Sequence, residues 1–192
     1  TFGSYKNEII EREIRQGKLT LKQGAVLNYQ QVSLTEDEYN RFILENIKLR
    51  SGFKEFYAQI LSYNIPLAVV SGGFENAIRL VFEREGLLSI KAYANTLIFN
   101  GNSNSIKFFN KEDKCFTGIG PCGNCKLENL RDFKTRCEKV IYIGDGITDR
   151  CAVHEADMVF ARGELEEYCI KENILYKKYN DFHDISNEIF GE

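Results

Sequence analysis

The sequence lacks the long apolar run that a membrane-spanning helix requires. Crossing the hydrocarbon core of a bilayer takes about 20 consecutive apolar residues. The most apolar stretch of this chain, residues 65–70, has only the length of a strand, and such a run suits the interior of a sheet. We therefore expect a soluble protein that does not bind membranes.

The chain also lacks an excess of positive charge. Its 25 Lys and Arg residues are outnumbered by 28 Asp and Glu residues, which gives a formal net charge of −3 at pH 7. The basic side chains are scattered among acidic ones, so they create no positive stripe for phosphate backbones. The composition argues against nucleic acid as a partner, and it does not indicate an oligomeric state.

Six cysteines in 192 residues are too few for a scaffold held by disulfides. Cys137, Cys151 and Cys169 lie in helix-like or strand-edge contexts, where a thiol packs as a small hydrophobic side chain. This usage favours a reducing environment, and we expect a cytoplasmic protein.

Cys115, Cys122 and Cys125 form a separate group. Cys122-Gly123-Asn124-Cys125 has the spacing of a zinc knuckle or a redox loop. A tetrahedral structural zinc site needs four ligands, and no second pair of cysteines follows at suitable spacing. Three interpretations stay open for these cysteines: unmodified thiols in a loop, a local disulfide, and metal binding.

The first part of the chain is charged and helix-prone. Ile9, Ile10 and Ile14 recur at helical spacing, and residues 34–38 resemble a capped helix start that runs into further apolar residues. This part contains no convincing strand. We expect a small helical domain over residues 1–50.

After Arg50 the pattern changes to alternating helices and strands. The predicted elements are a helix over 51–63, a strand over 66–70, a helix over 75–85, an antiparallel excursion with a tight turn at Asn100-Gly101, a helix from Lys126 to about Cys137, a strand over 140–143, a helix through Ala156 and a strand over 158–160. Solid apolar strands that alternate with helices predict an α/β fold, with a parallel sheet covered on both faces. We expect this domain over residues 51–192.

Two predicted strand ends carry unusual residues, and ligands of such folds bind beyond the carboxyl ends of the strands. The first is Ser71-Gly72-Gly73, between a buried strand and a helix N-terminus. Exposed amides, a positive helix end and a serine hydroxyl together make an anion site in outline. The alternative is a glycine-rich turn with no ligand.

The second strand end is Gly144-Asp145-Gly146-Ile147-Thr148-Asp149. Asp145 and Asp149 project into the same crevice, where two carboxylates repel each other unless a hard cation such as Mg²⁺ lies between them. The alternative is a pair of aspartates that cap the following helix.

Together these motifs resemble those of phosphatases of the haloacid-dehalogenase superfamily. Ser71-Gly72-Gly73, then Lys126 at a helix start, then the motif that ends at Asp149 match the family's second, third and fourth motifs in order and spacing. Three motifs in register are far more specific than any one alone. The stretch 49–162 is most similar to the phosphoserine-phosphatase-like branch, and Cys122 to Lys126 resembles the approach to the motif lysine in methionine-salvage enol-phosphate phosphatases.

The resemblance implies a Rossmannoid parallel sheet with a small helical cap, and a phosphoric monoester hydrolase that uses Mg²⁺. Ser71, with the Gly72 and Gly73 amides, would bind the phosphate of a small phosphorylated metabolite. Lys126 would neutralise that phosphate, Asp145 would be the direct Mg²⁺ ligand, and Asp149 would hold a metal-bound water or orient Lys126. The resemblance thus makes Ser71, Lys126 and Asp149 catalytic candidates, and Asp145 and Asp149 metal candidates.

The family's first motif, Asp-x-Asp-x-Thr, does not occur in these 192 residues. In the family this motif ends the central strand of the sheet and supplies the nucleophilic aspartate. Because the chain begins with Thr1 and has no signal-peptide pattern, we expect the motif and its strand upstream of residue 1, and we expect residues 1–192 alone to be inactive.

Two other functions stay open from the sequence. One is a catalytically inactive relative that binds a phosphorylated ligand or a partner protein, and the other is an unrelated doubly wound binding domain. The upstream sequence discriminates among them. The residues do not identify the substrate. Several charged side chains of the predicted cap either contact an amino-acid substrate or form an ordinary solvated helix face: Glu11, Arg12, Arg15, Lys18 and Lys22.

Overall fold

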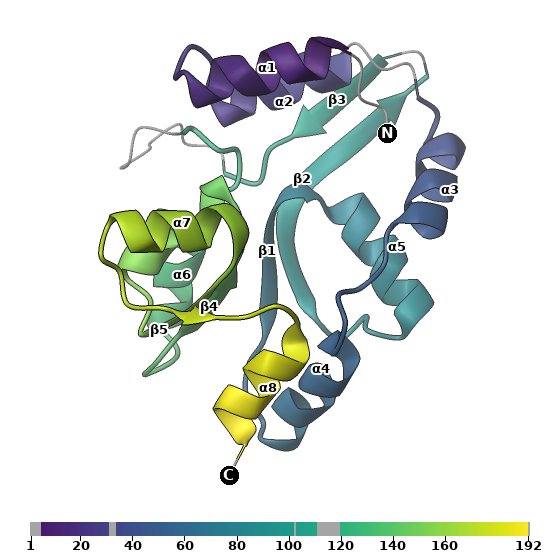
Figure 1. Cartoon of the computed structure of the whole chain (residues 1–192). Helices are drawn as coiled ribbons and strands as arrows, with labels where there is room; N and C mark the ends of the chain where they lie inside the picture. Colours follow the sequence, from purple (N-terminus) through teal and green to yellow (C-terminus); the bar gives the residue numbers. More distant parts are fainter. Residues whose placement is uncertain (1–4, 31–33, 102, 111–119, 192) are drawn as a thin grey trace. The chain divides into compact units, whose positions relative to one another are not determined.

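A computed structural model describes residues 5–30, 34–101, 103–110 and 120–191. The chain divides into two compact units (Figure 1). The first unit comprises Thr1–Ile47 and Ala68–Cys125, and the second comprises Lys48–Leu67 and Lys126–Glu192. The boundaries of these compact units differ from the predicted boundary at residue 50. The division into a cap over residues 1–50 and a core over residues 51–192 therefore stays a prediction.

Among the described residues, the first unit contains six helices and strands that the sequence predicts and one helix, α2, that it does not. Its elements are α1 (Tyr5–Arg15), α2 (Leu21–Gln30), α3 (Glu36–Asn46), β1 (Ala68–Phe74), α5 (Glu75–Glu85), β2 (Lys91–Asn100) and β3 (Ser103–Lys107). Helix α2 packs against α1 and β3, whereas α3 packs against α5. Residues 5–30 and 34–47 hold helices and no strand, as the sequence predicts.

The predicted start of the third helix is confirmed in detail. The Thr35 side chain accepts from the Glu38 amide at 3.3 Å, and the Glu38 carboxylate accepts from the Thr35 amide at 2.9 Å, which completes a capping box. At the other end of α3, Arg84 donates to the carbonyl oxygens of Leu44 and Ile47, each at 2.8 Å. Both ends of the helix are therefore satisfied by side chains.

The sheet of the first unit has the order β1-β2-β3. Strands β1 and β2 are parallel, and β2 and β3 are antiparallel, with Asn100 opposite Ser103. The predicted antiparallel excursion with a turn after Asn100 is thus confirmed. Among the described residues β1 pairs only with β2.

Strand β1 extends beyond the predicted end at Val70 and includes Ser71-Gly72-Gly73, which the sequence places in a loop. Ladder pairing is interrupted after Val70 and resumes at Phe74 opposite Asn95. Between these points, side-chain amides bond to the carbonyl oxygens of Ser71 and Gly72 in place of a neighbouring strand. These tertiary contacts keep the backbone extended, and local glycine content gives no sign of them.

The second unit holds a fully parallel sheet of order β4-β5-β6. Its elements are α4 (Phe53–Ser62), α6 (Lys126–Lys134), β4 (Ile141–Gly144), β5 (Met158–Ala161), α7 (Gly163–Lys171), β6 (Lys177–Lys178) and α8 (Phe182–Phe190). Helix α4 packs against α8, with the rings of Phe53 and Phe182 4.9 Å apart. Parallel strands and covering helices in this unit confirm the predicted α/β class.

The predicted helix through Ala156 is wrong. Two short 3-10 helices, Ile147–Asp149 and Ala152–His154, occupy that segment. The Asp149 carboxylate accepts from the backbone amides of Asp145 and Gly146, and such a local bond draws the backbone into a turn instead of a regular helix. Helix α6 is likewise shorter than predicted and ends at Lys134.

Cys169 is fully buried in the core of the second unit, with Leu165 and Ala161. Burial raises the pKa of its thiol above the usual value, so the side chain stays neutral and packs as a small hydrophobic residue, as the sequence predicts. Within the described part of the chain, no helix is long and apolar enough to cross a membrane.

Candidate active site

Ser71 lies near the carboxyl end of β1, directly before two exposed glycines. Its Oγ accepts from the Gly73 amide at 3.0 Å, so the hydroxyl proton stays available for a ligand. A side chain added at Gly72 would meet no atom within 4 Å, which shows open space above this residue. Helix α5 then begins at Glu75 without a side-chain cap, and its first amides favour an anion.

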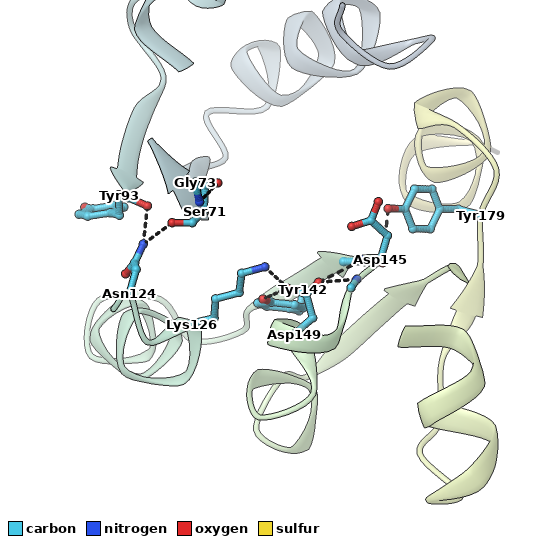
Figure 2. Close-up of polar contacts among 11 residues, drawn as sticks. Ser71, Gly73, Tyr93, Asn124, Lys126, Tyr142, Asp145, Asp149 and Tyr179 are labelled. Atoms are coloured by element: carbon cyan, nitrogen blue, oxygen red, sulfur yellow. Dashed lines mark hydrogen bonds and ion pairs between the residues drawn. The ribbon is translucent and has the colours of Figure 1, made fainter. Parts of the chain in front are cut away.

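Two buried asparagines hold this end of β1 in place. Asn124 Nδ2 donates to the carbonyl oxygens of Ser71 at 2.8 Å and Tyr93 at 2.7 Å (Figure 2). Asn95 Nδ2 donates to the Gly72 carbonyl at 2.8 Å. Asn124 is 1% exposed and Asn95 is 2% exposed. Because a buried carbonyl without a donor is costly, these amides fix the backbone that carries Ser71.

The Cys122–Cys125 loop takes part in the same arrangement. The Asn110 amide donates to the Gly123 carbonyl at 2.9 Å, and the Asn110 side chain accepts from the Cys125 amide. Cys122 and Cys125 are not joined to each other by a disulfide, and Cys115 lies outside the described residues. The loop therefore has a structural role: it delivers Asn124 to the carbonyls at Ser71.

Lys126 is the first residue of α6, in the second unit, and it pairs with Asp149 in the turn after β4 (Figure 2). Lys126 Nζ lies 2.5 Å from Asp149 Oδ1, and the side chains are 12% and 3% exposed. The family resemblance implies that Asp149 either holds a metal-bound water or orients Lys126, and the structure brings these two side chains together. The hydroxyl of Tyr142, from β4, donates to the same oxygen at 2.6 Å.

The second oxygen of Asp149 is also fully used. Oδ2 accepts from the amides of Gly146 at 2.9 Å and Asp145 at 3.1 Å. A Cβ at Gly144 would lie 2.7 Å from the Asp149 carboxyl carbon, so only glycine permits this close approach. Asp149 thus accepts four hydrogen bonds, from Lys126, Tyr142 and two backbone amides.

Asp145 has a very different environment, although it is four residues away. Its side chain is 56% exposed, and its nearest cation is Arg50, with Nη2 at 3.4 Å from Oδ2. Beneath it the Tyr179 hydroxyl donates to the Gly144 carbonyl at 3.4 Å. Burial, and then the negative charge of Asp145, raise the pKa of Tyr179 to about 12, so this hydroxyl keeps its proton at neutral pH.

The two aspartates differ in their suitability as metal ligands. The Asp145 carboxylate has lone pairs open to solvent, and Mg²⁺ commonly takes one or two protein carboxylates together with waters and substrate phosphate. Asp149 has no lone pair left over, so its position fits the orientation of Lys126 better than direct ligation. Within the described ranges, no cluster of three or more His, Cys, Asp and Glu side chains forms a closed metal cage.

The sequence alone does not identify all residues around Ser71 and around Asp149. It names the motif residues of the first unit, at positions 71–73, and those of the second, at 126, 145 and 149. It misses Asn95, Tyr142 and Tyr179, and it quotes Asn124 and Arg50 only as parts of longer matches. A polar residue inside the apolar run of β2 was the one available signal for Asn95.

The whole chain is similar to known phosphatases. No protein-family model matches it. A 2-hydroxy-3-keto-5-methylthiopentenyl-1-phosphate phosphatase of Bacillus cereus is 31% identical to it, over 96% of this chain and 81% of the relative. The similarity therefore extends well beyond the three motifs.

Solved structures share the fold. A phosphoserine phosphatase, determined as a phospho-aspartyl intermediate analogue, superposes with a TM-score of 0.69 and 21% identity, over 96% of this chain and 85% of that one. A hydrolase of the haloacid-dehalogenase family from Salmonella enterica serovar Typhi gives a TM-score of 0.76 and 20% identity, over 98% and 62% of the two chains. At these identities the structures support the fold alone.

Proposed function

Because this chain belongs to the phosphoserine-phosphatase-like branch of the haloacid-dehalogenase superfamily, we propose that it hydrolyses phosphoric monoesters of small metabolites. The proposed reaction uses Mg²⁺ and passes through an aspartyl-phosphate. The aspartyl-phosphate is supported by the family's first motif and by the phospho-aspartyl analogue of the structural neighbour. Residues 1–192 contain no Asp-x-Asp-x-Thr, so the roles proposed below concern binding and charge.

The buried pair of Lys126 and Asp149 is the observation that carries this proposal. An exposed lysine is ordinarily solvated, and burying its charge is costly without a partner. Here the ammonium lies 2.5 Å from a carboxylate that also accepts three protein donors. We propose that Asp149 orients Lys126, and that the ammonium neutralises the phosphate as charge develops on it.

The exposed carboxylate of Asp145 is the proposed direct Mg²⁺ ligand, and Asp149 is the residue behind it. When bound, the cation would supply electrostatic stabilisation of the phosphate oxygens. Arg50 currently pairs with Asp145 at 3.4 Å, with both side chains solvent-accessible. Such an exposed pair contributes little free energy, so it presents a small obstacle to a cation that needs the same carboxylate.

Ser71 is the proposed phosphate-binding residue of the first unit. Its hydroxyl accepts from Gly73 and can donate its own proton to a phosphate oxygen. The exposed Gly72 amide is the second proposed donor, and the Gly73 amide joins when it leaves Ser71 Oγ. Both glycines leave room for close approach of a ligand to the backbone.

The substrate is the finer part of the proposal. The curated relative is named for 2-hydroxy-3-keto-5-methylthiopentenyl-1-phosphate, and we propose an ester of this class as the substrate of this chain. Phosphoserine is the comparison substrate, because the structural neighbour is a phosphoserine phosphatase.

Hydrolysis of 4-nitrophenyl phosphate by the protein expressed from its complete gene tests the reaction class. We expect turnover with Mg²⁺, its loss in excess chelator, and its return when Mg²⁺ is added back. Released inorganic phosphate is measured alongside the phenolate, so that both products are accounted for.

The reaction without enzyme and the reaction with Lys171→Met serve as controls, because Lys171 is exposed and pairs with the exposed Glu172 at 3.7 Å. Turnover that persists in chelator would contradict the role of Mg²⁺. Binding of phosphate esters without any turnover would favour an inactive relative that binds its ligand.

A further inference from the structure

An aromatic residue of the cap helix α2 touches the end of β1 within the first unit. The ring of Tyr29 packs edge-on against Phe74, with centroids 4.7 Å apart and planes at 90°. Phe74 directly follows Gly73 and precedes the first residue of α5. Tyr29 is therefore held one residue away from the proposed phosphate-binding turn.

Tyr29 carries an apolar ring and a hydroxyl, and both kinds of group can contact a ligand. Phe74 occupies one part of the ring, and the side chain remains partly exposed. In the described part of the chain, no hydrogen bond to the Tyr29 hydroxyl is recorded. Burial raises the pKa of this hydroxyl above its usual value, so it stays a neutral donor under ordinary conditions.

The charged residues of α1 do not supply comparable contacts. Glu11 and Arg12 are exposed on a solvated face, and Lys18, beyond the end of α1, is exposed as well. Lys22 of α2 is held elsewhere: its ammonium lies 5.0 Å from the Phe108 ring centroid, and its amide donates to the Pro121 carbonyl at 3.0 Å. The contact between Tyr29 of α2 and Phe74 of β1 is aromatic and uncharged.

We propose that Tyr29 is a specificity-determining residue that contacts the leaving group of the substrate. When Ser71 and Gly72 hold the phosphate, the ester oxygen and the carbon chain of the substrate extend past Phe74. There the Tyr29 ring offers an apolar surface, and the Tyr29 hydroxyl offers one hydrogen-bond donor. This site favours a leaving group with an uncharged, partly apolar chain and an acceptor oxygen, and it disfavours the zwitterion of an amino acid. The proposal rests on the phosphatase function above and deepens it.

Steady-state kinetics of Tyr29 variants test this role in the protein from the complete gene. Tyr29→Leu keeps apolar volume but removes the ring and hydroxyl, and Tyr29→Phe removes the hydroxyl alone. For an ester with an uncharged apolar leaving group, we expect kcat/KM to fall about tenfold in the Leu variant and about threefold in the Phe variant, mainly through KM. For O-phosphoserine, kcat/KM should change less than twofold, so the selectivity collapses.

Inhibition by inorganic phosphate separates a leaving-group contact from a structural role. We expect the inhibition constant to stay within about twofold in both variants, because the phosphate turn itself is unchanged. Tyr63→Phe is the matched control: this exposed tyrosine of the second unit stacks on Phe190, with centroids 5.0 Å apart, and should leave all kinetic constants unchanged.

Two results would overturn the role of Tyr29. Unchanged selectivity in a folded Tyr29→Leu variant would remove it from the site, and an equal loss for all esters and for phosphate inhibition would make it structural. Failure of the unmodified protein to hydrolyse any ester is a different result, because it refutes the phosphatase function itself.

Discussion

The end of β1 at Ser71 is held by neutral amides, whereas the turn at Asp149 is built around a buried charge. Asn95 and Asn124 each donate to backbone carbonyls, and both partners of these bonds are neutral. Asp149 gathers an ammonium, a phenol and two backbone amides on one carboxylate. The stability of the arrangement at Ser71 should be insensitive to salt and to pH near neutrality. The stability of the arrangement at Asp149 depends on each donor that contacts its carboxylate.

Asp145→Asn gives the largest expected effect. The substitution keeps the shape of the side chain and removes the negative charge of the exposed carboxylate that is the proposed Mg²⁺ ligand. We expect Mg²⁺-dependent turnover to fall by about three orders of magnitude or more, with an unchanged Tm. Asp132→Asn is the control, since Asp132 pairs with Arg136 on an exposed helix face. Near-normal turnover of Asp145→Asn would remove this residue from the site.

Lys126→Met tests the buried pair itself. The methionine keeps most of the apolar stem and deletes the ammonium, so turnover should fall by about two orders of magnitude. Asp149 keeps three of its four donors but loses its cation, and we expect the free energy of unfolding to fall by about 3 kcal/mol. Urea unfolding and single-turnover kinetics measure the two effects. Full activity in this variant would refute the proposed role of Lys126.

Asn124→Ala tests the neutral arrangement in the first unit. It leaves the carbonyls of Ser71 and Tyr93 without this donor, and we expect a loss of about 2–3 kcal/mol in the free energy of unfolding. The loss should be the same at low and high salt. Asn46→Ala is the matched control, because Asn46 bonds to the Phe42 carbonyl on an exposed helix. A strongly salt-dependent loss would break the contrast between the two turns.

The stability of the second unit should depend on alkaline pH through Tyr179. The pKa of Tyr179 is raised from 10.0 to about 12, so the fold favours the protonated phenol. Its contribution to stability is complete below pH 10 and is lost as the pH rises from 10 to 12. We expect about 2 kcal/mol of pH-dependent loss in this window, absent in Tyr179→Phe. Equal pH profiles of the two proteins would contradict this account.

Tyr142→Phe gives the smallest expected effect. It removes one of four donors to Asp149 and keeps the ring, so the carboxylate retains Lys126 and both amides. We expect turnover to fall about threefold to tenfold and the free energy of unfolding to fall by about 1 kcal/mol. A loss as large as that of Lys126→Met would mean that the phenol, and not the ammonium, dominates at Asp149.

The fold was predictable where local pattern and tertiary environment agree. The capping box at Thr35, the parallel strands and the helix that begins at Lys126 all follow from periodicity and end signals. The prediction fails at Ser71-Gly72-Gly73 and between Asp149 and Ala156. In both places side chains replace the regular backbone pattern, and hydrophobic periodicity carries no record of such bonds.

By itself, the sequence determined the family and the identity of the motif residues, because the order and spacing of Ser71, Lys126 and the two aspartates are one-dimensional facts. Only the tertiary structure decided what distinguishes Asp145 from Asp149. Both are aspartates in one short motif, but one is open to solvent and the other is enclosed by four donors, one of them 23 residues away in the chain. The availability of a carboxylate for a metal depends on burial and on the donors around it, and folding alone brings those donors together.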